Sequence, residues 1–313
     1  MSGVAFLFPG QGSQQPGMGR ELHRAFPESR EVFERADEAL GFPISRICFE
    51  GTEEELARTE ITQPAILTVS VAAQRALESR GIRPAAAAGH SLGEYSAHVA
   101  AGTISFEDAV RAVRLRGRFM QEAVPLGVGS MAAILGLEEE AVRGICAECA
   151  DGEVVSAANV NGGGQIVIAG HSGAVARASE RALRAGARRA VPLPVSAPFH
   201  CALMEPARER LRPVLQGIDF HDPGVPVFAN ADAAPVTTAA AAREALLRQV
   251  ASPVRWEETV RRMAGEGTQV FVEVGPGRVL AGLVRRIARG AEVLPASDPG
   301  EILAAAGRTG EAA

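Results

Sequence analysis

The residues best suited to chemistry lie in the pentapeptide at positions 89–93, Gly-His-Ser-Leu-Gly. It stands between residues 85–88, a short apolar run that predicts a strand, and residues 94–101, which predict a helix. A serine on such a turn is held in a strained backbone, and the flanking glycines let strand and helix pass close together. The pattern is typical of a nucleophile elbow, which exposes the Ser91 hydroxyl and points the Leu92 N–H into the same space.

A nucleophilic serine needs a base, and His200 is the strongest candidate. It ends the segment at residues 194–200, in which two prolines stiffen the chain. His90 is adjacent to Ser91, but neighbouring residues on a tight turn point in different directions, so we expect it to be a packing residue. Surface or loop positions are expected for the other four histidines, His23, His98, His171 and His221.

Residues 105–122 predict a long helix that carries four arginines. Three of them are expected to form a solvated face. Arg116, which precedes Gly117, lies at the boundary with the apolar side of the helix. It is therefore the arginine expected to reach a pocket.

The loop at residues 9–14, Pro-Gly-Gln-Gly-Ser-Gln, follows the buried strand expected at residues 4–8. It is not a dinucleotide-binding loop, because Gln15 replaces the third glycine of that motif. Gln11, between two glycines just past a strand end, suits an amide site at the carboxyl edge of an α/β sheet. An ordinary turn explains the same residues equally well.

The composition excludes several classes of protein. All basic residues of the 313 are arginines, which rules out a P-loop lysine and Schiff-base chemistry. The net charge of −5 argues against nucleic acid as a partner. No apolar run is long enough for a membrane span, and the first residues do not resemble a signal peptide, so we expect a cytoplasmic protein that does not bind membranes.

The cysteines do not predict a disulfide framework or a metal site. Cys146 and Cys149 are spaced as C-x-x-C, but they lie in a predicted helix without a second pair or a nearby histidine. We expect free thiols, and no metal.

The middle of the chain predicts a separate small domain. Strands are expected at 131–135, 154–159, 165–169 and 190–193, and helices at 138–150 and 174–184. This β-α-β-β-α-β order is that of a ferredoxin-like unit. We therefore place an inserted domain at residues 126–194, and a discontinuous α/β-hydrolase-like core with a parallel sheet at residues 1–125 and 195–313.

Two features of the small domain resemble site chemistry. Ser172, in Gly-His-Ser-Gly at 170–173, is expected to be a helix N-cap, because the second glycine comes one position too early for an elbow. Asn159 and Asn161 are expected in a loop lining a cleft between the domains, although turn chemistry also explains them.

The remaining segments complete the core. Helices are predicted at 63–78, 203–214, 241–251 and 279–289, and strands at 225–229 and 270–274. The helix at 241–251 carries Gln249 near its end. The tail from residue 299, rich in alanine and glycine, is expected to be frayed.

Together these segments resemble a known family. The loop at 9–14, the elbow at 89–93 with Glu-Tyr-Ser after it, the segment 116–121 and the segment 195–204 look like the malonyl-CoA:acyl carrier protein transacylases of fatty acid synthesis. Related acyltransferase domains of polyketide synthases share much of the pattern. The match runs through nearly the whole chain in the right order.

The resemblance implies a role for each site residue. Ser91 would be the nucleophile and His200 its base, with Arg116 binding the malonyl carboxylate. The oxyanion hole would consist of the main-chain N–H groups of Gln11 and Leu92. A main-chain carbonyl would orient the histidine, and it would fall at Gln249.

The resemblance also implies a reaction and its partners. Malonyl-CoA would be a substrate rather than a cofactor, no cofactor is expected, and the acceptor would be an acidic carrier protein bearing phosphopantetheine. In the related polyketide domains, a phenylalanine before this histidine is found where malonyl units are used, so Phe199 is expected to exclude methylmalonyl groups. Asn161 is also assigned to substrate binding. We expect a monomer.

Five arginines are candidates for a basic rim that meets the carrier protein: Arg188, Arg189, Arg285, Arg286 and Arg289. Scattered, solvated arginines are the alternative. Two other functions remain open at this point, a serine esterase and a catalytically silent protein that only docks carrier proteins.

Overall fold

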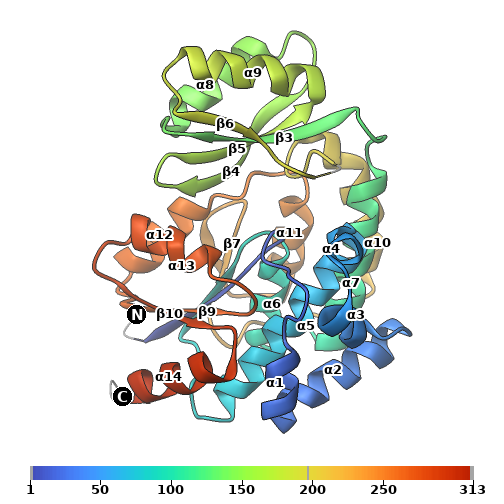
Figure 1. Ribbon diagram of the computed structural model, residues 1–313, viewed down its shortest axis with the longest axis vertical. Coiled ribbons are helices and arrows are strands. Elements are labelled where there is room, and N and C mark those ends of the chain that lie inside the picture. Colours follow the sequence, from blue (N-terminus) through green and yellow to red (C-terminus); the bar gives the residue numbers. More distant parts are fainter. Residues whose placement is uncertain (1–2, 196, 311–313) are drawn as a thin grey trace.

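The computed structural model describes residues 3–195 and 197–310. Two sheets lie one above the other along the long axis of the molecule (Figure 1). The larger sheet has six strands in the order β10-β9-β1-β2-β7-β8, and the smaller has four in the order β4-β5-β3-β6. The chain is thus an α/β protein with two separate sheets.

The six-stranded sheet is parallel except at one edge, where β7 and β8 are antiparallel. Side chains alternate across its short apolar strands. Phe6 and Phe8 join the core on one face, whereas Ala5 and Leu7 join the core on the other. The strands are β1 (Val4–Phe8), β2 (Ala86–Gly89), β7 (Val227–Ala229), β8 (Ala234–Val236), β9 (Val270–Val274) and β10 (Glu292–Ala296).

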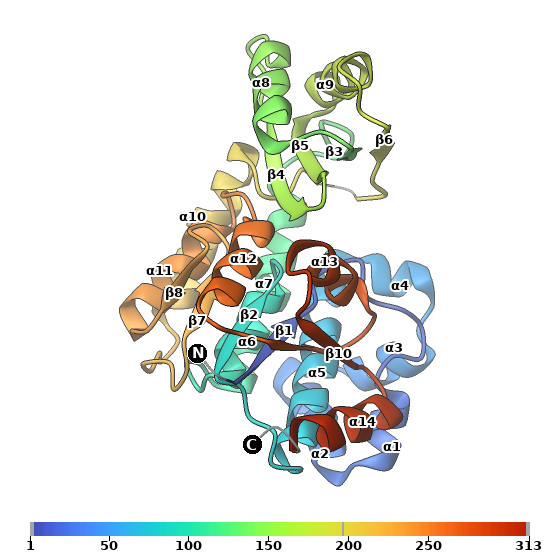
Figure 2. The ribbon, with the colours of Figure 1, turned by 90° about the vertical axis from the view of Figure 1, so that its left-hand side faces the viewer.

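Helices cover both faces of this sheet, as a mostly parallel sheet requires (Figure 2). The core around Phe6 and Phe8 includes α5 and α7, and the core around Ala5 and Leu7 includes α12 and α13. The helices packed around this sheet are α1 (Arg20–Ala25), α2 (Pro27–Leu40), α3 (Ile44–Glu50), α4 (Glu53–Ala57), α5 (Thr59–Glu78), α6 (Gly93–Ala100), α7 (Phe106–Glu122), α10 (Glu205–Gln216), α11 (Ala239–Gln249), α12 (Trp256–Gly265), α13 (Val279–Ile287) and α14 (Pro299–Gly310).

The four-stranded sheet is antiparallel, and its predicted β-α-β-β-α-β order is confirmed. Its two helices pack on the face turned away from the rest of the molecule (Figure 1). Its elements are β3 (Gly129–Leu135), α8 (Glu139–Cys149), β4 (Val155–Gly162), β5 (Gln165–His171), α9 (Ser172–Arg184) and β6 (Arg189–Pro192).

Main-chain hydrogen bonds join the small sheet to the rest of the chain. The N–H of Val160 in β4 donates to the carbonyl of Val254 over 2.9 Å, and the N–H of Val254 donates to Ala158 over 2.8 Å. Val254 lies between α11 and α12, so β4 is tied directly to the segment that follows α11.

Two helix predictions were wrong. The helix expected from residue 63 begins at Thr59, and Pro64 lies inside it rather than in its first turn. Burial of Thr59 and Thr62 against neighbouring elements outweighs the proline signal. Residues 299–310 of the tail form α14, in which Ile302 and Ala305 are buried, because an apolar stripe at helical spacing runs through its small residues. Residues 311–313 lie outside the described residues.

Three predictions for polar residues also need correction. Ser172 is the first residue of α9 rather than its N-cap, and its hydroxyl donates to the carbonyl of Gly127. Asn159 and Asn161 lie within β4, because pairing with β5 continues past them. His98 is fully buried in α6 rather than at a surface or in a loop.

Within the described residues, no helix is long and apolar enough to cross a membrane.

Candidate active site

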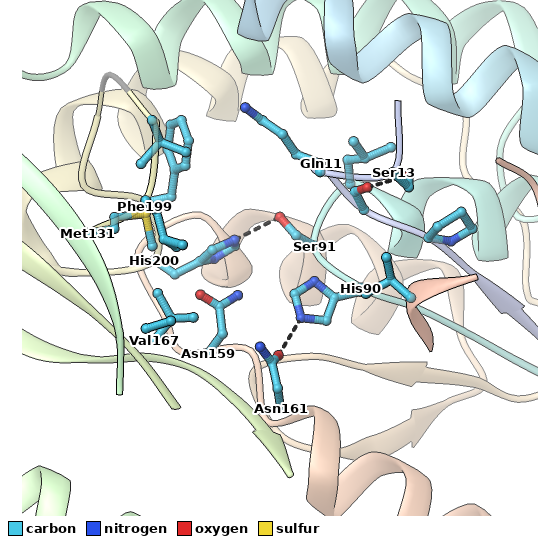
Figure 3. Close-up of a pocket in the computed structure, with 18 of the residues that line it drawn as sticks. Gln11, Ser13, His90, Ser91, Met131, Asn159, Asn161, Val167, Phe199 and His200 are labelled. Carbon is cyan, nitrogen blue, oxygen red and sulfur yellow. Dashed lines mark hydrogen bonds between the residues drawn. The ribbon is translucent and has the colours of Figure 1, made fainter. Parts of the chain in front are cut away.

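The parallel strands of the large sheet end at a pocket of about 240 Å³ that the small sheet closes from the other side (Figure 3). The loops after β1 and β2 line it on the side of the large sheet, and residues of β3, β4 and β5 line it on the side of the small sheet. Parallel sheets place their sites at this carboxyl edge. Seven of the predicted site residues line the pocket: Gln11, Ser91, Leu92, Arg116, Asn161, Phe199 and His200.

Ser91 sits on the sharp turn between β2 and α6, with a φ of 52°. A side chain at either glycine of the motif would prevent that turn. A Cβ on Gly89 would lie 1.9 Å from the main chain of Gly93, and a Cβ on Gly93 would lie 2.2 Å from the carbonyl oxygen of Phe8. The glycines therefore allow β1, β2 and α6 to meet beneath the serine.

The Ser91 Oγ lies 2.7 Å from Nε2 of His200 (Figure 3). The other ring nitrogen, Nδ1, lies 3.0 Å from the main-chain oxygen of Gln249, which can only accept. Nδ1 thus carries the proton, and Nε2 is free to accept the proton of Ser91. Burial, and then the positive charge of Arg116, lower the pKa of His200 to about 3, so the imidazole is neutral.

Arg116 is almost completely buried, as the boundary position on α7 predicts. Its Nη1 donates to Oε1 of Gln63 over 2.8 Å, and its Nη2 donates to Oε1 of Gln249 over 2.7 Å. Nη2 also lies 3.1 Å from the Oγ of Ser91. Within the described residues the guanidinium forms no ion pair, so its charge is available to an anion bound beside the serine.

The main-chain N–H groups of Gln11 and Leu92 line the pocket, and neither has an acceptor within the described residues. The Ser91 N–H is different, because it donates to Oδ1 of Asn230 over 2.7 Å. Free N–H groups beside a nucleophile are what an oxyanion hole requires.

His90 both packs and lines the pocket, so the expectation of a packing residue was incomplete. Its ring lies 5.6 Å from that of Trp256, and its Nε2 lies 2.9 Å from Oδ1 of Asn161 (Figure 3). Burial lowers the pKa of His90. This contact connects the elbow of the large sheet to β4 of the small sheet.

Sequence reasoning missed three polar residues that surround the site: Gln63, Glu94 and Asn230. Asn230 follows the carboxyl end of β7, just as the elbow follows the carboxyl end of β2. A polar residue at that edge of the sheet could have identified it as a site residue. Glu94 and Gln63 lie inside helices, where the sequence shows nothing that distinguishes them from ordinary polar positions. Burial raises the pKa of Glu94 to about 7.

No group of three His, Cys, Asp or Glu side chains within residues 3–195 and 197–310 is arranged to hold a metal ion. The four cysteines are free thiols, and Cys146 and Cys149 lie on α8 as predicted. Three side chains suited to acyl transfer meet at this pocket: the Ser91 hydroxyl, the neutral His200 imidazole and the buried Arg116 guanidinium.

Comparison with known proteins agrees with this geometry. Residues 5–301 match the acyl transferase domain family. A malonyl CoA-acyl carrier protein transacylase from Bacillus subtilis (strain 168) is 50% identical over 300 residues, which cover 96% of this chain and 95% of that protein. The transacylase of Escherichia coli (strain K12) is 51% identical over 288 residues, or 92% of this chain and 93% of that protein.

The chain belongs to the malonyl-CoA:acyl carrier protein transacylase family.

Solved structures of this transacylase family have the same fold. The transacylase of Coxiella burnetii superposes with a TM-score of 0.96 at 46% identity and covers 98% of both chains. A malonyl-transacylase solved in complex with its type II polyketide synthase acyl-carrier protein gives a TM-score of 0.96 at 47% identity, over 98% of this chain and 100% of that one. The family resemblance predicted from four short segments is thus confirmed along the whole chain.

Proposed function

We propose that the protein transfers a malonyl group from malonyl-CoA to the phosphopantetheine thiol of an acyl carrier protein through a malonyl-serine intermediate, and so supplies fatty acid or polyketide synthesis. The observation that carries this proposal is the position of Arg116, whose unpaired guanidinium lies 3.1 Å from the Oγ of Ser91. A cation there suits an acyl group with a second, free carboxylate, because arginine binds carboxylates in a bidentate manner.

In the first half-reaction, His200 takes the proton of the Ser91 hydroxyl as Oγ attacks the thioester carbonyl of malonyl-CoA. The N–H groups of Gln11 and Leu92 stabilise the resulting oxyanion. The C–S bond then breaks, and the imidazolium gives its proton to the departing CoA thiolate. The product is malonyl ester on Ser91 and free CoA.

In the second half-reaction, His200 takes the proton of the carrier-protein thiol, and the thiolate attacks the ester carbonyl. Collapse of this second oxyanion returns the proton to Ser91 Oγ and leaves malonyl on the carrier protein. Thioester is converted to thioester, so no cofactor is needed. Arg116 holds the distal carboxylate throughout, which keeps the ester carbonyl at the oxyanion donors.

Phe199 is proposed to select malonyl over methylmalonyl units. It is buried and lines the pocket beside His200 (Figure 3). A ring in this position occupies the space that an α-methyl group would need. Comparable rates of acyl-enzyme formation from malonyl-CoA and methylmalonyl-CoA would contradict this role, and Phe199→Ser should bring the two rates closer together.

The carrier protein is proposed to dock on the five arginines of the basic rim, Arg188, Arg189, Arg285, Arg286 and Arg289, all of which are exposed. Contacts near the junction of the two sheets involve two of them, Arg286 and Arg188. Arg286 of α13 packs over Gly163, in the turn between β4 and β5, and Arg188 packs over Gly136. The Gly136 N–H in turn donates to the carbonyl of Gly164, which precedes the pocket residue Gln165.

The domain assignment is part of the same proposal. We propose that residues 1–125 and 195–313 form an α/β-hydrolase-like core, and that residues 126–194 form an inserted ferredoxin-like domain. The strand order β4-β5-β3-β6, with both helices on one face, supports the ferredoxin-like assignment. The elbow at the end of a parallel strand supports the hydrolase-like assignment. We further propose a cytoplasmic monomer with no nucleic-acid or membrane partner.

The decisive experiment is incubation with malonyl-CoA, followed by peptide mass analysis of the adduct. We expect one malonyl group on Ser91, removal of that group by a holo carrier protein, and no adduct on Ser91→Ala. Rapid release of free malonate instead of transfer would indicate an esterase. Absence of any adduct on the folded protein would indicate a docking protein without this activity.

A further inference from the structure

Gln249, the last residue of α11, contacts the proposed nucleophile, base and carboxylate-binding residue at once. It is completely buried. Its main-chain oxygen accepts from His200, and its side-chain Oε1 accepts from Nη2 of Arg116 over 2.7 Å. Its Nε2 donates to the main-chain oxygen of Ser91 over 2.8 Å and to Oε2 of Glu94 over 2.7 Å.

The contact with the Ser91 carbonyl determines the direction of another group. The carbonyl of Ser91 and the N–H of Leu92 belong to one planar trans peptide, so they point in opposite directions. A donor that fixes the carbonyl on one side therefore fixes the Leu92 N–H on the other side. The hydrogen bond from Gln249, together with the 3.1 Å bond that the Glu94 N–H donates to the same carbonyl, holds this N–H toward the pocket, where it has no acceptor within the described residues.

We propose that Gln249 is a positioning residue for the oxyanion hole. Its side-chain amide holds the Ser91–Leu92 peptide in place and polarises the N–H of Leu92. This inference rests on the proposed function. It differs from the orienting role of the Gln249 main-chain carbonyl, because any residue at position 249 has that carbonyl. Only a side-chain donor of the length of glutamine reaches the main-chain oxygen of Ser91.

The orientation of the Gln249 amide is itself fixed. The guanidinium of Arg116 can only donate, so the amide oxygen must face it. The amide nitrogen then faces Glu94, whose Oε2 also accepts the N–H of Asn230 over 2.9 Å. Neither group allows the amide to flip.

Asn230 holds the peptide on the other side of Ser91. Its Oδ1 accepts the Ser91 N–H, and its Nδ2 donates to the carbonyl of Gly89 over 2.7 Å. Gln249 and Asn230 thus hold the main chain on both sides of a residue whose φ of 52° is unfavourable for a serine. The Leu92 N–H is also polarised, because its own peptide carbonyl already accepts a hydrogen bond.

The test replaces Gln249 with methionine, which has a similar length and no donor, and leaves the main-chain carbonyl in place for His200. The matched control is Gln63→Met, which also removes an amide oxygen from Arg116 but does not contact the Ser91 peptide. Gln249→Asn is a second variant, used in case the methionine variant does not fold. It keeps an amide at the site but is one methylene shorter, so the amide no longer reaches the Ser91 carbonyl.

Two measurements are made on wild type and each variant: the rate of acylation by malonyl-CoA in a rapid-quench experiment, and the infrared stretch of the ester carbonyl on Ser91, labelled with ¹³C. Both Gln63→Met and Gln249→Met should raise the KM for malonyl-CoA through Arg116. Only the Gln249 variants should lower the acylation rate at saturation, by roughly 10- to 100-fold, which is less than the loss of a whole oxyanion donor.

The same Gln249 variants should move the ester carbonyl stretch to higher frequency, because the carbonyl then accepts a weaker hydrogen bond. The inference is wrong if the folded Gln249 variants match Gln63→Met in both measurements. If wild type forms no ester on Ser91, the proposed function itself fails, and this outcome is distinct from the first.

Discussion

At the scale of single residues, the site joins four residues that lie far apart in the sequence. Ser91 and His200 are 109 residues apart, and Arg116 and Gln249 are 133 residues apart. The neutral imidazole of His200 and the guanidinium of Arg116, which has no ion pair within the described residues, both depend on the burial of the site. Substitution of a single side chain at one of these positions should therefore change one kinetic property of the enzyme and leave the others measurable.

Replacement of Arg116 tests its recognition of the acyl carboxylate. Arg116→Lys keeps the charge but loses the bidentate geometry, so the kcat/KM for malonyl-CoA should fall by roughly 10- to 100-fold, the equivalent of one charge-assisted hydrogen bond. The rate with acetyl-CoA, which has no distal carboxylate, should fall much less. Rapid-quench acylation with both thioesters measures this selectivity, and equal losses for the two would contradict it.

The pH dependence of acylation tests the state of His200. Because burial and Arg116 lower its pKa to about 3, the free enzyme keeps a neutral base well below the ordinary histidine pKa of about 6.5. His200 should thus contribute no pH dependence to the kcat/KM for malonyl-CoA, which reports the free enzyme, between about pH 5 and pH 8. Burial raises the pKa of Glu94 to about 7, so the profile is also measured on Glu94→Gln. A half-maximal rate near pH 6.5 in folded Glu94→Gln would mean that His200 is solvated.

The sequence predicted the residues whose types and local motifs are distinctive. Ser91 stands in a glycine-bounded turn, His200 follows a proline-rich segment, and Arg116 lies at the edge of an apolar face. Glu94 could not be predicted, because its importance arises from a contact with Gln249 that spans more than a hundred residues. An amide or carboxylate shows such a role only when the packing of distant segments is known.

At the scale of elements, the elbow depends on the approach of β2 to α6. Gly89→Ala should be severely destabilising, by more than about 3 kcal/mol, because a Cβ would overlap the main chain of Gly93 and backbone cannot move aside. Gly144→Ala is the control. Gly144 lies within α8 with open space around it, so alanine should stabilise by about 0.5–1 kcal/mol. Urea unfolding measures both, and a stable, fully active Gly89→Ala would contradict the elbow packing.

Helix α6 also carries an acid-sensitive residue. His98 is buried without a hydrogen-bond partner within the described residues, and burial lowers its pKa to about 3. Its unfolded pKa is about 6.5, so the unfolded chain binds the proton first and stability is lost as the pH falls below 6.5. At pH 5 this loss is about 2 kcal/mol.

The variant His98→Met should remove that part of the acid sensitivity. The difference in unfolding free energy between His98→Met and wild type should shift in favour of the variant by about 2 kcal/mol between pH 7.5 and pH 5. His200 titrates in the same range but is present in both proteins, so its contribution cancels. Urea unfolding at the two pH values measures the shift, and an unchanged difference would show that His98 is protonated in the folded state.

Most element types were predictable, although β8, β10 and α12 were not expected, and two of the failures have a common cause. The strands of the large sheet are short apolar runs, and the small domain has clear alternating elements. The predictions at Pro64 and in the alanine-rich tail were wrong because they relied on local composition. Proline favoured a helix start at residue 63, and alanine and glycine favoured a frayed end. Tertiary packing overrides both, since residues of α5 and α14 such as Thr62 and Ile302 are completely buried.

At the scale of the whole molecule, the two sheets form a fixed cleft. The hydrogen bonds of Val254 with β4, and the contact of His90 with Asn161, both cross from one sheet to the other. The pocket lies between these connections. Substrates that enter one after the other, as the proposed reaction requires, thus meet the same preformed site.

The proposed basic rim provides the last prediction. Its arginines have no ion-pair partner within the part of the chain that the structure describes, whereas many other surface arginines are paired with carboxylates. Arg286→Glu replaces a charge that an acidic carrier protein would meet. The KM for the carrier protein should rise roughly 10-fold and depend on salt, and the rate of acylation by malonyl-CoA should stay the same.

The matched control is Arg83→Glu. Arg83 is also exposed and has no ion pair within the described residues, but it precedes β2 at the amino edge of the sheet, opposite the pocket. The net charge changes equally in both variants. A general effect of charge would raise the KM for the carrier protein in both, whereas docking on the rim requires that Arg286→Glu alone does so. Equal KM values for the two variants would therefore remove the rim from the proposed function and leave the chemistry at Ser91 unaffected.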